Sequence, residues 1–290
     1  MTEKTTDNLY RVIKCESNTF TLEKIGERIS AVARKKFKRG GIVAGDFVSV
    51  EKEGGGAVIT EIAQRKNYFI RPLSANIDCI VIMVAPQPQP DFFLIDKLII
   101  NALRQNVEAV ICLNKTDISD SLIKTLIEQY GSVVDKIVGV SAKEGDLEPL
   151  KGAIAGKLSC FAGQSAVGKS SVSNALLSGE SRAVGELSEK IMRGKNTTTK
   201  AEILTAEPNI YIIDTPGFSM LDIFDIRFDE LDLYYPEYLE PSHSCRYHRC
   251  THTSEPDCKV KALVEEGKLN KERYLRYKQL FEELKSRKQY

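Results

Sequence analysis

The sequence has almost no net charge and no long apolar run. Its 41 Lys and Arg side chains face 40 Asp and Glu side chains, so any attraction to nucleic acid must come from local patches. The longest apolar run, IDCIVIMVAP at 77–86, is about half the ~20 residues that span a bilayer. The N-terminal MTEKTTDNLY lacks the apolar core of a secretory signal. We therefore expect a soluble, cytoplasmic protein.

The sequence also lacks a set of evenly paired cysteines. Seven is an odd number, and Cys15, Cys79, Cys112 and Cys160 are scattered singly among apolar residues, as reduced core thiols are. The other three cysteines and all three histidines fall within residues 243–258. A disulfide framework is therefore not expected.

Two basic patches interrupt the balanced charge. Residues 1–70 carry 13 Lys/Arg against 9 Asp/Glu, with the dense run ARKKFKRG at 33–40, and residues 268–290 carry 8 against 3. Each patch fits either a nucleic-acid contact or an ordinary solvated face.

Three segments of different character follow one another along the chain. Five short strand-like pieces with Gly-rich turns fill residues 1–70 and predict a small antiparallel, OB-like barrel. From 71 to 221, continuous apolar strands alternate with helical stretches and predict an α/β domain with a parallel sheet. Residues 222–290 combine an acidic aromatic stretch, the Cys/His cluster and a terminal helix. In that helix Tyr274, Tyr277, Leu280, Phe281 and Leu284 recur at helical spacing, which predicts a core face.

A phosphate-binding loop is the first chemical motif. GQSAVGKS fits G-x-x-x-x-G-K-[ST] between a strand-like and a helix-capable segment. Gly163 and Gly168 let the backbone curl so that its N–H groups point at phosphate oxygens. Lys169 then neutralises the β and γ phosphates, and Ser170 offers its hydroxyl to Mg²⁺. The alternative is a Gly-rich turn with an exposed lysine. The residues assigned to phosphate binding are Gly163, Gln164, Ser165, Ala166, Val167, Gly168, Lys169, Ser170 and Ser171.

Two further segments predict contacts to Mg²⁺ and the γ-phosphate. DTPG places Asp214 at a strand's carboxyl end, where it can hold Mg²⁺ through water, and the Gly217 N–H can meet the γ-phosphate. In RGKNTTTKAEI, Thr198 is the favoured Mg²⁺ ligand, with Thr197 as second choice, and it would release the ion after hydrolysis. An ordinary turn and a mobile linker remain the alternatives.

A guanine-reading motif precedes the phosphate loop. NKTD ends an apolar strand, and the Asp117 carboxylate can accept from the N1 and N2 donors of guanine, which adenine does not present. Asn114 would brace the loop, and Lys115 would cover the base. The backbone of Ser141 and Ala142 in SAK can meet the guanine O6. Either tetrapeptide alone could be a surface turn. The residues assigned to the base are Asn114, Lys115, Thr116, Asp117, Ser141, Ala142 and Lys143.

The Cys/His cluster has the spacing C-x4-C-x-H-x5-C. Cys245, Cys250, His252 and Cys258 form a closed tetrahedral set for structural Zn²⁺, with no open position for catalysis. The remaining histidines of the cluster are expected at the surface. A disulfide is the competing interpretation, and an odd thiol count in a cytoplasmic chain disfavours it.

These motifs, in this order, resemble the ribosome small-subunit-dependent GTPase A family, whose members are circularly permuted GTPases. The match covers nearly the whole chain, from the barrel through NKTD, SAK, GQSAVGKSS, NTTT and DTPG to the zinc spacing and the terminal helix. The order is compatible with one nucleotide site because the site depends on where strands finish and not on chain order.

The resemblance implies binding of GTP and GDP with magnesium, one structural zinc, and hydrolysis stimulated by the small ribosomal subunit during its late maturation. It implies that the barrel and the zinc domain contact ribosomal RNA, and the run Arg34 to Arg39 around Phe37 is the barrel candidate. We expect a monomer that binds neither DNA nor a membrane.

Two positions depart from the family pattern. Asn196 stands where members usually carry a histidine that is a candidate for placing the attacking water; Asn can hydrogen-bond a water but cannot act as a base. Ala166 stands where glycine is common, a change expected to be minor.

Two rival functions remain open: an ATP-dependent P-loop enzyme such as a kinase, and a zinc-bearing RNA-binding protein whose guanine-nucleotide site is regulatory with little turnover.

Overall fold

The computed structural model describes residues 9–34, 37, 41–53, 56–70, 72–177, 201–207, 209–214 and 226–287. The chain forms two compact units, each built from three separate pieces of sequence. The first comprises Met1–Ile80, Lys151–Phe161 and Lys169–Phe218, and the second Val81–Leu150, Ala162–Gly168 and Ser219–Tyr290. The domain boundaries expected after residues 70 and 221 stay predictions.

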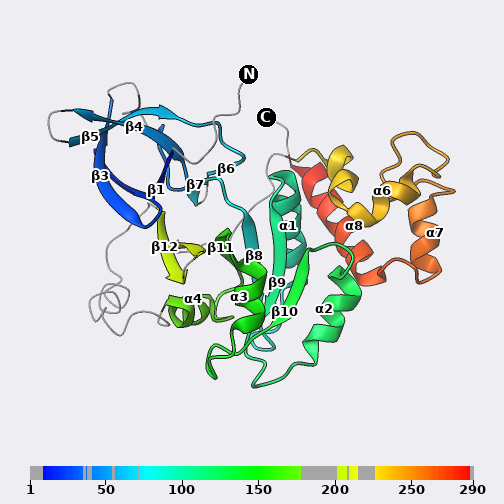
Figure 1. Ribbon diagram of the computed structural model, residues 1–290. Helices are drawn as coiled ribbons and strands as arrows, with labels where there is room; N and C mark the ends of the chain where they lie inside the picture. The colour runs from blue at the N-terminus through cyan, green and yellow to red at the C-terminus, as the bar shows by residue number, and fades with distance from the viewer. Residues whose placement is uncertain are drawn as a thin grey trace. The chain divides into compact units, whose positions relative to one another are not determined.

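The N-terminal part of the first unit is a closed five-stranded β-barrel (Figure 1). Its strands are β1 (Tyr10–Glu16), β2 (Thr19–Lys24), β3 (Glu27–Ala33), β4 (Phe47–Glu53) and β5 (Gly56–Ile62). β1 pairs with both β2 and β4, β2 pairs with β3, and β5 pairs with β3 and β4, so the sheet closes on itself. Inward-facing residues such as Val12, Leu22 and Ile59 are fully buried. The predicted barrel is confirmed, with one parallel pair, β3 and β5, among antiparallel ones.

The rest of the first unit combines strands and a helix that follow the barrel in sequence. β6 (Tyr68–Ile70) and β7 (Leu73–Ala75) form a two-stranded antiparallel sheet. β11 (Leu158–Gly163) pairs in parallel with β13 (Ile210–Asp214), which pairs antiparallel with β12 (Glu202–Glu207). α4 (Lys169–Leu177) follows β11 and packs on β12. Every residue of β11 is buried, as expected of a strand covered on both faces.

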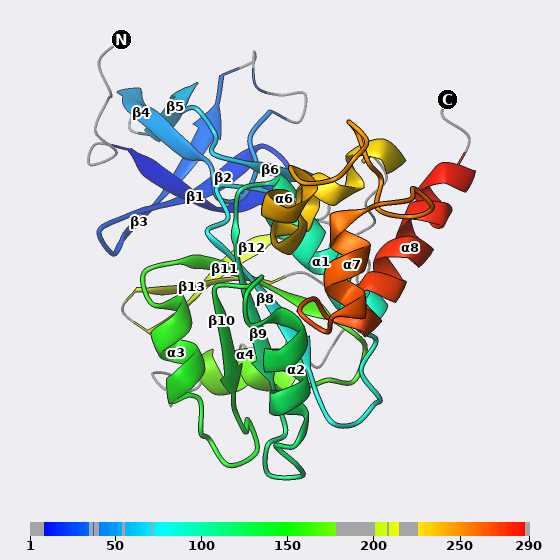
Figure 2. The same ribbon diagram turned by 90° about the vertical axis from the view of Figure 1, so that its right-hand side faces the viewer.

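The second unit contains three strands in the order β8 (Cys79–Val84), β9 (Glu108–Leu113) and β10 (Lys136–Gly139), the last two parallel. α1 (Phe92–Arg104) packs on β9, and α2 (Leu122–Tyr130) packs on β10 (Figure 2). The Asp91 side chain caps α1 by accepting from Leu94 N at 2.9 Å. α1 buries Ile95, Leu98, Ile99 and Ala102, the 3.6-residue stripe of a helix on a sheet. α3 (Glu148–Ile154) follows β10.

A helical region completes the second unit. It contains the 3₁₀ helix η3 (Phe228–Tyr234) and the α-helices α6 (Pro236–Ser242), α7 (Lys259–Glu265) and α8 (Lys271–Ser286). α8 packs against α1 and α7 (Figure 2). The rings of Tyr235, Tyr238 and Tyr277 lie 4.9–5.2 Å apart in its centre. All five residues of the predicted α8 stripe are buried, which confirms that the stripe is core.

A buried ionic network joins α8 to α1. The Asp96 carboxylate on α1 is 1% exposed and accepts from the guanidinium groups of Arg273 and Arg276 on α8. Arg273 also donates to Glu237 on α6. A buried charge is tolerated only when it is paired, so these contacts fix α8 on α1. Among the helices that the structure describes, none has the length and apolar character needed to cross a membrane.

Candidate functional site

The residues expected to bind phosphate run from the end of β11 into α4. At Gly163, φ is +136° and an added Cβ would lie 2.3 Å from the Met83 carbonyl oxygen; at Gly168, φ is +96° and it would lie 2.3 Å from Asn114 Nδ2. Both positions therefore require glycine. Ala166 adopts a φ of 64°, a region that L-residues disfavour. α4 begins at Lys169, so a helix N-terminus follows the loop directly.

The Lys169 amine is partly buried, and burial lowers its pKa. A bound anion would favour the charged form and oppose this shift. β13 ends at Asp214, the position from which the sequence predicts a contact to Mg²⁺. Asn196, the threonines 197–199 and Gly217 lie outside the described residues.

Asn114 connects three loops of the second unit. Its side chain is buried, its Nδ2 donates to the Val167 carbonyl at 3.0 Å, and its Oδ1 accepts from Ala142 N at 3.2 Å. Thr116 N adds a hydrogen bond of 3.2 Å to the Val140 carbonyl. The loops after β9 and β10 and the loop after β11 are therefore held together by one amide side chain.

Lys115 reaches from the loop after β9 to the phosphate-loop motif. Its Nζ donates to the carbonyl oxygens of Ala166 and Gln87, each at 2.8 Å. The backbone at Lys115 has a φ of 65°. These bonds hold the aliphatic part of the side chain in place, so it can form an apolar cover for a planar ring.

Asp117 is held by a residue of the loop after β10. Its Oδ1 accepts from the Ser141 hydroxyl at 2.8 Å, and Lys143 Nζ lies 3.7 Å from its Oδ2. The Ser141 hydroxyl thus fixes the direction of the carboxylate. An oriented carboxylate can accept from two adjacent N–H donors on one ligand edge, as guanine presents them.

Sequence reasoning named the side chains of these loops but missed their backbone partners. The carbonyls of Gln87 and Val167 carry no residue-type signal, because every residue has a carbonyl. Ser141 was assigned for its backbone, and the structure shows that its hydroxyl also contributes. A Ser two positions after a short strand is the available signal.

The four predicted metal ligands converge. The ligand atoms of Cys245, Cys250, His252 and Cys258 all lie within 4.8 Å of one another. His252 Nδ1 is 3.3 Å from Cys258 Sγ and 3.7 Å from Cys245 Sγ, and these two sulfurs are 3.9 Å apart. A tetrahedron with Zn–S bonds of about 2.3 Å has edges of about 3.8 Å between sulfurs, so the residues fit zinc. A disulfide needs an S–S distance of about 2.05 Å, which 3.9 Å excludes for this pair.

The environment of His252 selects one ring nitrogen as the ligand. His252 is fully buried, and its Nε2 lies 3.0 Å from the Ser242 hydroxyl and 3.8 Å from Asp232 Oδ2. Partners on Nε2 leave Nδ1 for the metal, the usual arrangement of a ligating histidine. His243 and His248 are exposed, as expected of residues outside the ligand set.

Glu255 braces the turn that carries His252, and sequence reasoning did not identify it. Its carboxylate accepts from Thr251 N, Thr251 Oγ1 and Thr253 N at 2.6–3.0 Å. Burial alone would raise the pKa of Glu255, but these donors lower it to about 2. The brace holds His252 at a φ of 58°, a left-handed conformation that needs support from its neighbours.

The comparisons with known proteins identify a family. The RsgA GTPase family model matches residues 62–224. A small ribosomal subunit biogenesis GTPase RsgA of Caldanaerobacter subterraneus subsp. tengcongensis is 40% identical over 268 residues, which are 89% of this chain and 90% of that protein. The RsgA of Thermotoga maritima is 38% identical over 288 residues, 96% and 97% of the two chains.

Two solved structures resemble the fold. The crystal structure of YjeQ from Thermotoga maritima matches with a TM-score of 0.83 at 35% identity, over 97% of this chain and 99% of that one. YloQ, described as a circularly permuted GTPase, matches with a TM-score of 0.78 at 28% identity over 100% of both chains. The chain belongs to the RsgA GTPase family.

Proposed function

We propose that the protein is a GTPase that binds the small ribosomal subunit and hydrolyses GTP to GDP and phosphate to assist late maturation of that subunit. One observation carries the proposal: Asn114 binds the loops after β10 and β11, so guanine-reading and phosphate-binding motifs meet although their order in the chain is permuted. The relatives named small ribosomal subunit biogenesis GTPases support the cellular role.

Guanine selection is assigned to Asp117. Its carboxylate would accept from the guanine N1–H and N2–H, while Ser141 holds its orientation. Adenine offers no such pair of donors, and a partly buried carboxylate left unpaired is costly. Lys115 would lie along the base, and the Ala142 backbone would meet the guanine O6.

Phosphate binding is assigned to the loop 163–171. Its backbone N–H groups and the N-terminus of α4 would bind phosphate oxygens, and Lys169 would neutralise the β and γ phosphates. Ser170 and Thr198 are the proposed magnesium ligands, with Asp214 acting through water; bound magnesium supplies charge stabilisation for phosphoryl transfer. Gly217 and Thr198 are proposed to sense the γ-phosphate, and Asn196 to help place the attacking water.

The zinc site is assigned a structural role. Four protein ligands leave no open coordination position, and the Nε2 partners of His252 orient its ring toward the cluster. The metal would hold the turn 245–258 against the tyrosine core, because Tyr274 and Tyr277 donate to the carbonyls of His252 and Thr251.

The proposed partner is the small ribosomal subunit with its ribosomal RNA, contacted by the barrel and the zinc-binding region. We propose a cytoplasmic, monomeric protein that binds neither DNA nor a membrane.

Measurement of GTP hydrolysis with and without purified small subunits tests the proposal. We expect slow basal turnover and strong acceleration by the subunits. Turnover that the subunits leave unchanged would remove the ribosomal partner. Competition between GTP and ATP in the same assay tests the base assignment: ATP binding as tight as GTP binding would favour a P-loop kinase. GTP binding without phosphate release, even with subunits, would favour the regulatory RNA-binding protein.

A further inference from the structure

An apolar pocket of about 270 Å³ opens at one end of the barrel. Its walls come from the end of β1, the turn between β1 and β2, the end of β3 and the segment before β4. These parts lie at the same end because β1 and β3 run antiparallel to β2. All of its lining residues belong to the first unit, and none of them is a residue of the nucleotide loops or of the Cys/His cluster.

The wall before β4 is fixed by a buried charge. Asp46 is fully buried, accepts from Val43 N at 2.9 Å, and is bound by two nitrogens of Arg65 at 2.7 and 2.8 Å. Arg65 also donates to the Gly41 carbonyl. At Gly45, φ is +91° and an added Cβ would lie 2.0 Å from the Ala75 carbonyl oxygen. The segment 41–46 is therefore rigid, and a ligand would find the pocket already formed.

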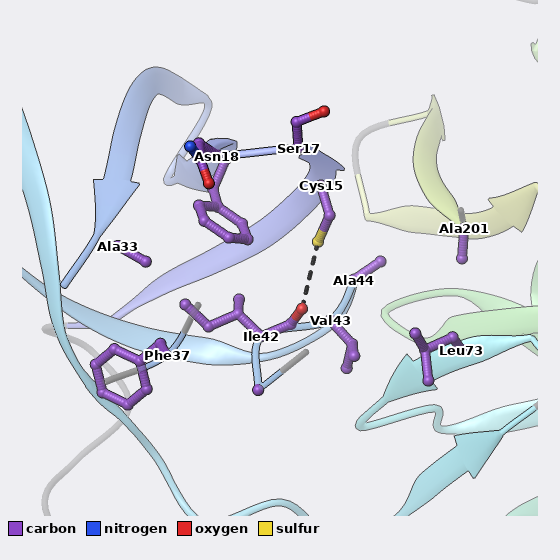
Figure 3. A pocket seen from close by; sticks show the side chains of 12 residues that line it. Cys15, Ser17, Asn18, Ala33, Phe37, Ile42, Val43, Ala44, Leu73 and Ala201 are labelled. Carbon is purple, nitrogen blue, oxygen red and sulfur yellow. Dashed lines mark hydrogen bonds between the residues drawn. The ribbon is translucent and has the colours of Figure 1, made fainter. Parts of the chain in front are cut away.

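The lining combines aromatic and aliphatic surfaces with an amide at the rim. Phe37, Phe20 and Ile42 provide the apolar surface. Figure 3 shows Ser17 and Asn18 on the side opposite Phe37, and the Cys15 sulfur pointing toward the Ile42 carbonyl. Asn18 is exposed, and within the described part of the chain its side chain has no hydrogen-bond partner. A planar ring with polar groups on its edge matches this lining, because the ring can stack on Phe37 while the amide both donates to and accepts from its edge.

Charge near Phe37 indicates the kind of molecule that carries this ring. In the sequence Phe37 is flanked by Lys35, Lys36, Lys38 and Arg39, with no acidic residue between 28 and 45. The neighbouring Arg34 is neutralised, because its guanidinium pairs with Glu51 at 2.7 Å and Glu53 at 3.0 Å. These four cations lie outside the described residues, but cations adjacent in sequence to an aromatic residue are a composition that binds single-stranded nucleic acid, phosphates to the cations and bases to the ring.

We propose that this pocket receives one unstacked base of a single-stranded segment of ribosomal RNA. Phe37 stacks on the base, Ile42 and Phe20 form the apolar floor, and Asn18 hydrogen-bonds the base edge. The inference rests on the proposed function, since the small ribosomal subunit is the source of the RNA. It goes beyond that function by naming the pocket, the group that enters it and the residues that hold it.

Cys15 provides a reporter inside the pocket. Its partly buried Sγ lies 3.8 Å from the Ile42 carbonyl oxygen, so a base in the pocket covers the thiol. The full-length, zinc-loaded protein is treated with iodoacetamide, and alkylation of the Cys15 peptide is followed by mass spectrometry. A single-stranded RNA of about ten nucleotides is the probe, and a duplex of the same length is the control. At a concentration ten times the dissociation constant, we expect the single strand to slow alkylation about tenfold. An unchanged rate with the single strand bound overturns the proposal.

Substitutions at Phe37 test the stacking contact. Phe37→Ala should weaken binding of the single strand about ten- to hundredfold, and Phe37→Tyr should retain it. Phe37→Leu keeps apolar volume but removes the ring, so binding as tight as in the wild type overturns the stacking role. Ile25→Ala is the matched control, because Ile25 is 94% exposed in the turn at the other end of β2. This variant should bind RNA as tightly as the wild type does. Thermal melting of each variant verifies that the barrel is folded.

The same variants separate this inference from the proposed function. Alkylation of Cys15 and GTP hydrolysis are measured together in the presence of small subunits. If subunits accelerate hydrolysis but leave Cys15 reactive, the pocket proposal fails alone. If subunits neither bind nor accelerate hydrolysis, the proposed function fails, and protection of Cys15 by free single-stranded RNA still decides whether the pocket accepts a base.

Discussion

The base-reading loops, residues 114–117 and 141–143, and the Cys/His segment, residues 245–258, are held together in different ways. Asn114 bonds to groups 28 and 53 positions away in the chain. The two base-reading loops follow the neighbouring parallel strands β9 and β10. The Cys/His segment gathers four ligands within 14 residues, and its turns are short. The parallel strands bring the first site together, whereas local turns bring together the four side chains of the second, which could hold a metal ion.

The two regions therefore differ in what would stabilise them: the sheet positions the base-reading loops, and a bound ion would stabilise the Cys/His segment. Strand ends keep their positions when the chain order is permuted, so the loops stay together as long as the sheet is intact. The Cys/His segment packs Cys250 and Cys258 against the tyrosine core, but three thiolates and an imidazole placed side by side are a set of ligands that a bound zinc would stabilise. Perturbing each region in turn should therefore produce separate effects.

Removal of zinc has the largest expected effect. A structural zinc contributes on the order of 10 kcal/mol to folding of its segment, so chelation or Cys258→Ser should unfold the segment and loosen the tyrosine core. The chain has no tryptophan, so near-ultraviolet circular dichroism reports mainly on tyrosines and should lose most of its signal. GTP affinity should change less than about threefold, since no base-reading side chain touches the cluster.

Cys15→Ser is the control for that experiment, because Cys15 lies in the barrel and outside the ligand set. It should keep one zinc per chain and an unchanged tyrosine signal. A zinc-free protein with a full tyrosine signal would show that packing alone holds the segment.

Asp117→Asn perturbs the other region. The amide cannot accept from both guanine donors, so GTP affinity should fall about a hundredfold, or about 3 kcal/mol, in a nucleotide-binding titration. Xanthosine triphosphate carries a carbonyl in place of the guanine 2-amino group and should bind the variant better than the wild type. Zinc content and the tyrosine signal should not change.

Asp120→Asn is the matched control, since Asp120 is an exposed carboxylate three residues further along the same loop. It should bind GTP as the wild type does. Equal loss in both variants would mean that Asp117 acts through general charge and not through the guanine edge.

The link between the regions can be weakened at Asp96. Asp96→Asn removes the negative charge and leaves the charges of Arg276 and, in part, Arg273 unpaired in the interior, which should lower the free energy of unfolding by about 3 kcal/mol in urea denaturation. Asp257→Asn removes a carboxylate that pairs with Arg246 at 2.7 Å on the surface, and should cost less than about 1 kcal/mol. Similar costs for the two variants would show that the buried network does not stabilise the α1–α8 contact.

The site was predictable where chemistry demands a residue type. Asp117 and the Cys/His set were predicted because guanine and zinc each need specific side-chain groups at fixed spacing. The structure places the four Cys/His side chains together, and the role of Asp117 stays a prediction. The barrel was predictable because alternating short strands have few other ways to bury their apolar face. Contacts through backbone carbonyls, such as that of Gln87, left no trace in the residue types. The pairing of Asp96 with Arg273 joins helices 177 positions apart, and each side chain alone looks like part of a solvated face.

Ala166→Gly is the smallest effect and tests the strain stored in the phosphate loop. The left-handed φ of 64° costs a non-glycine residue about 1–2 kcal/mol. Glycine avoids this cost, but it increases the conformational entropy of the unfolded chain, which offsets part of the gain in stability. We expect the substitution to raise the free energy of unfolding by about 0.5–1 kcal/mol, measured without nucleotide. Ala175→Gly, at an ordinary helical position in α4, should lower it by about 1 kcal/mol. Opposite signs of the change in the free energy of unfolding would locate the strain at position 166, because of the two positions only that one requires a left-handed conformation, which alanine disfavours. A lower free energy of unfolding in both variants would mean that the loop relaxes around the methyl group.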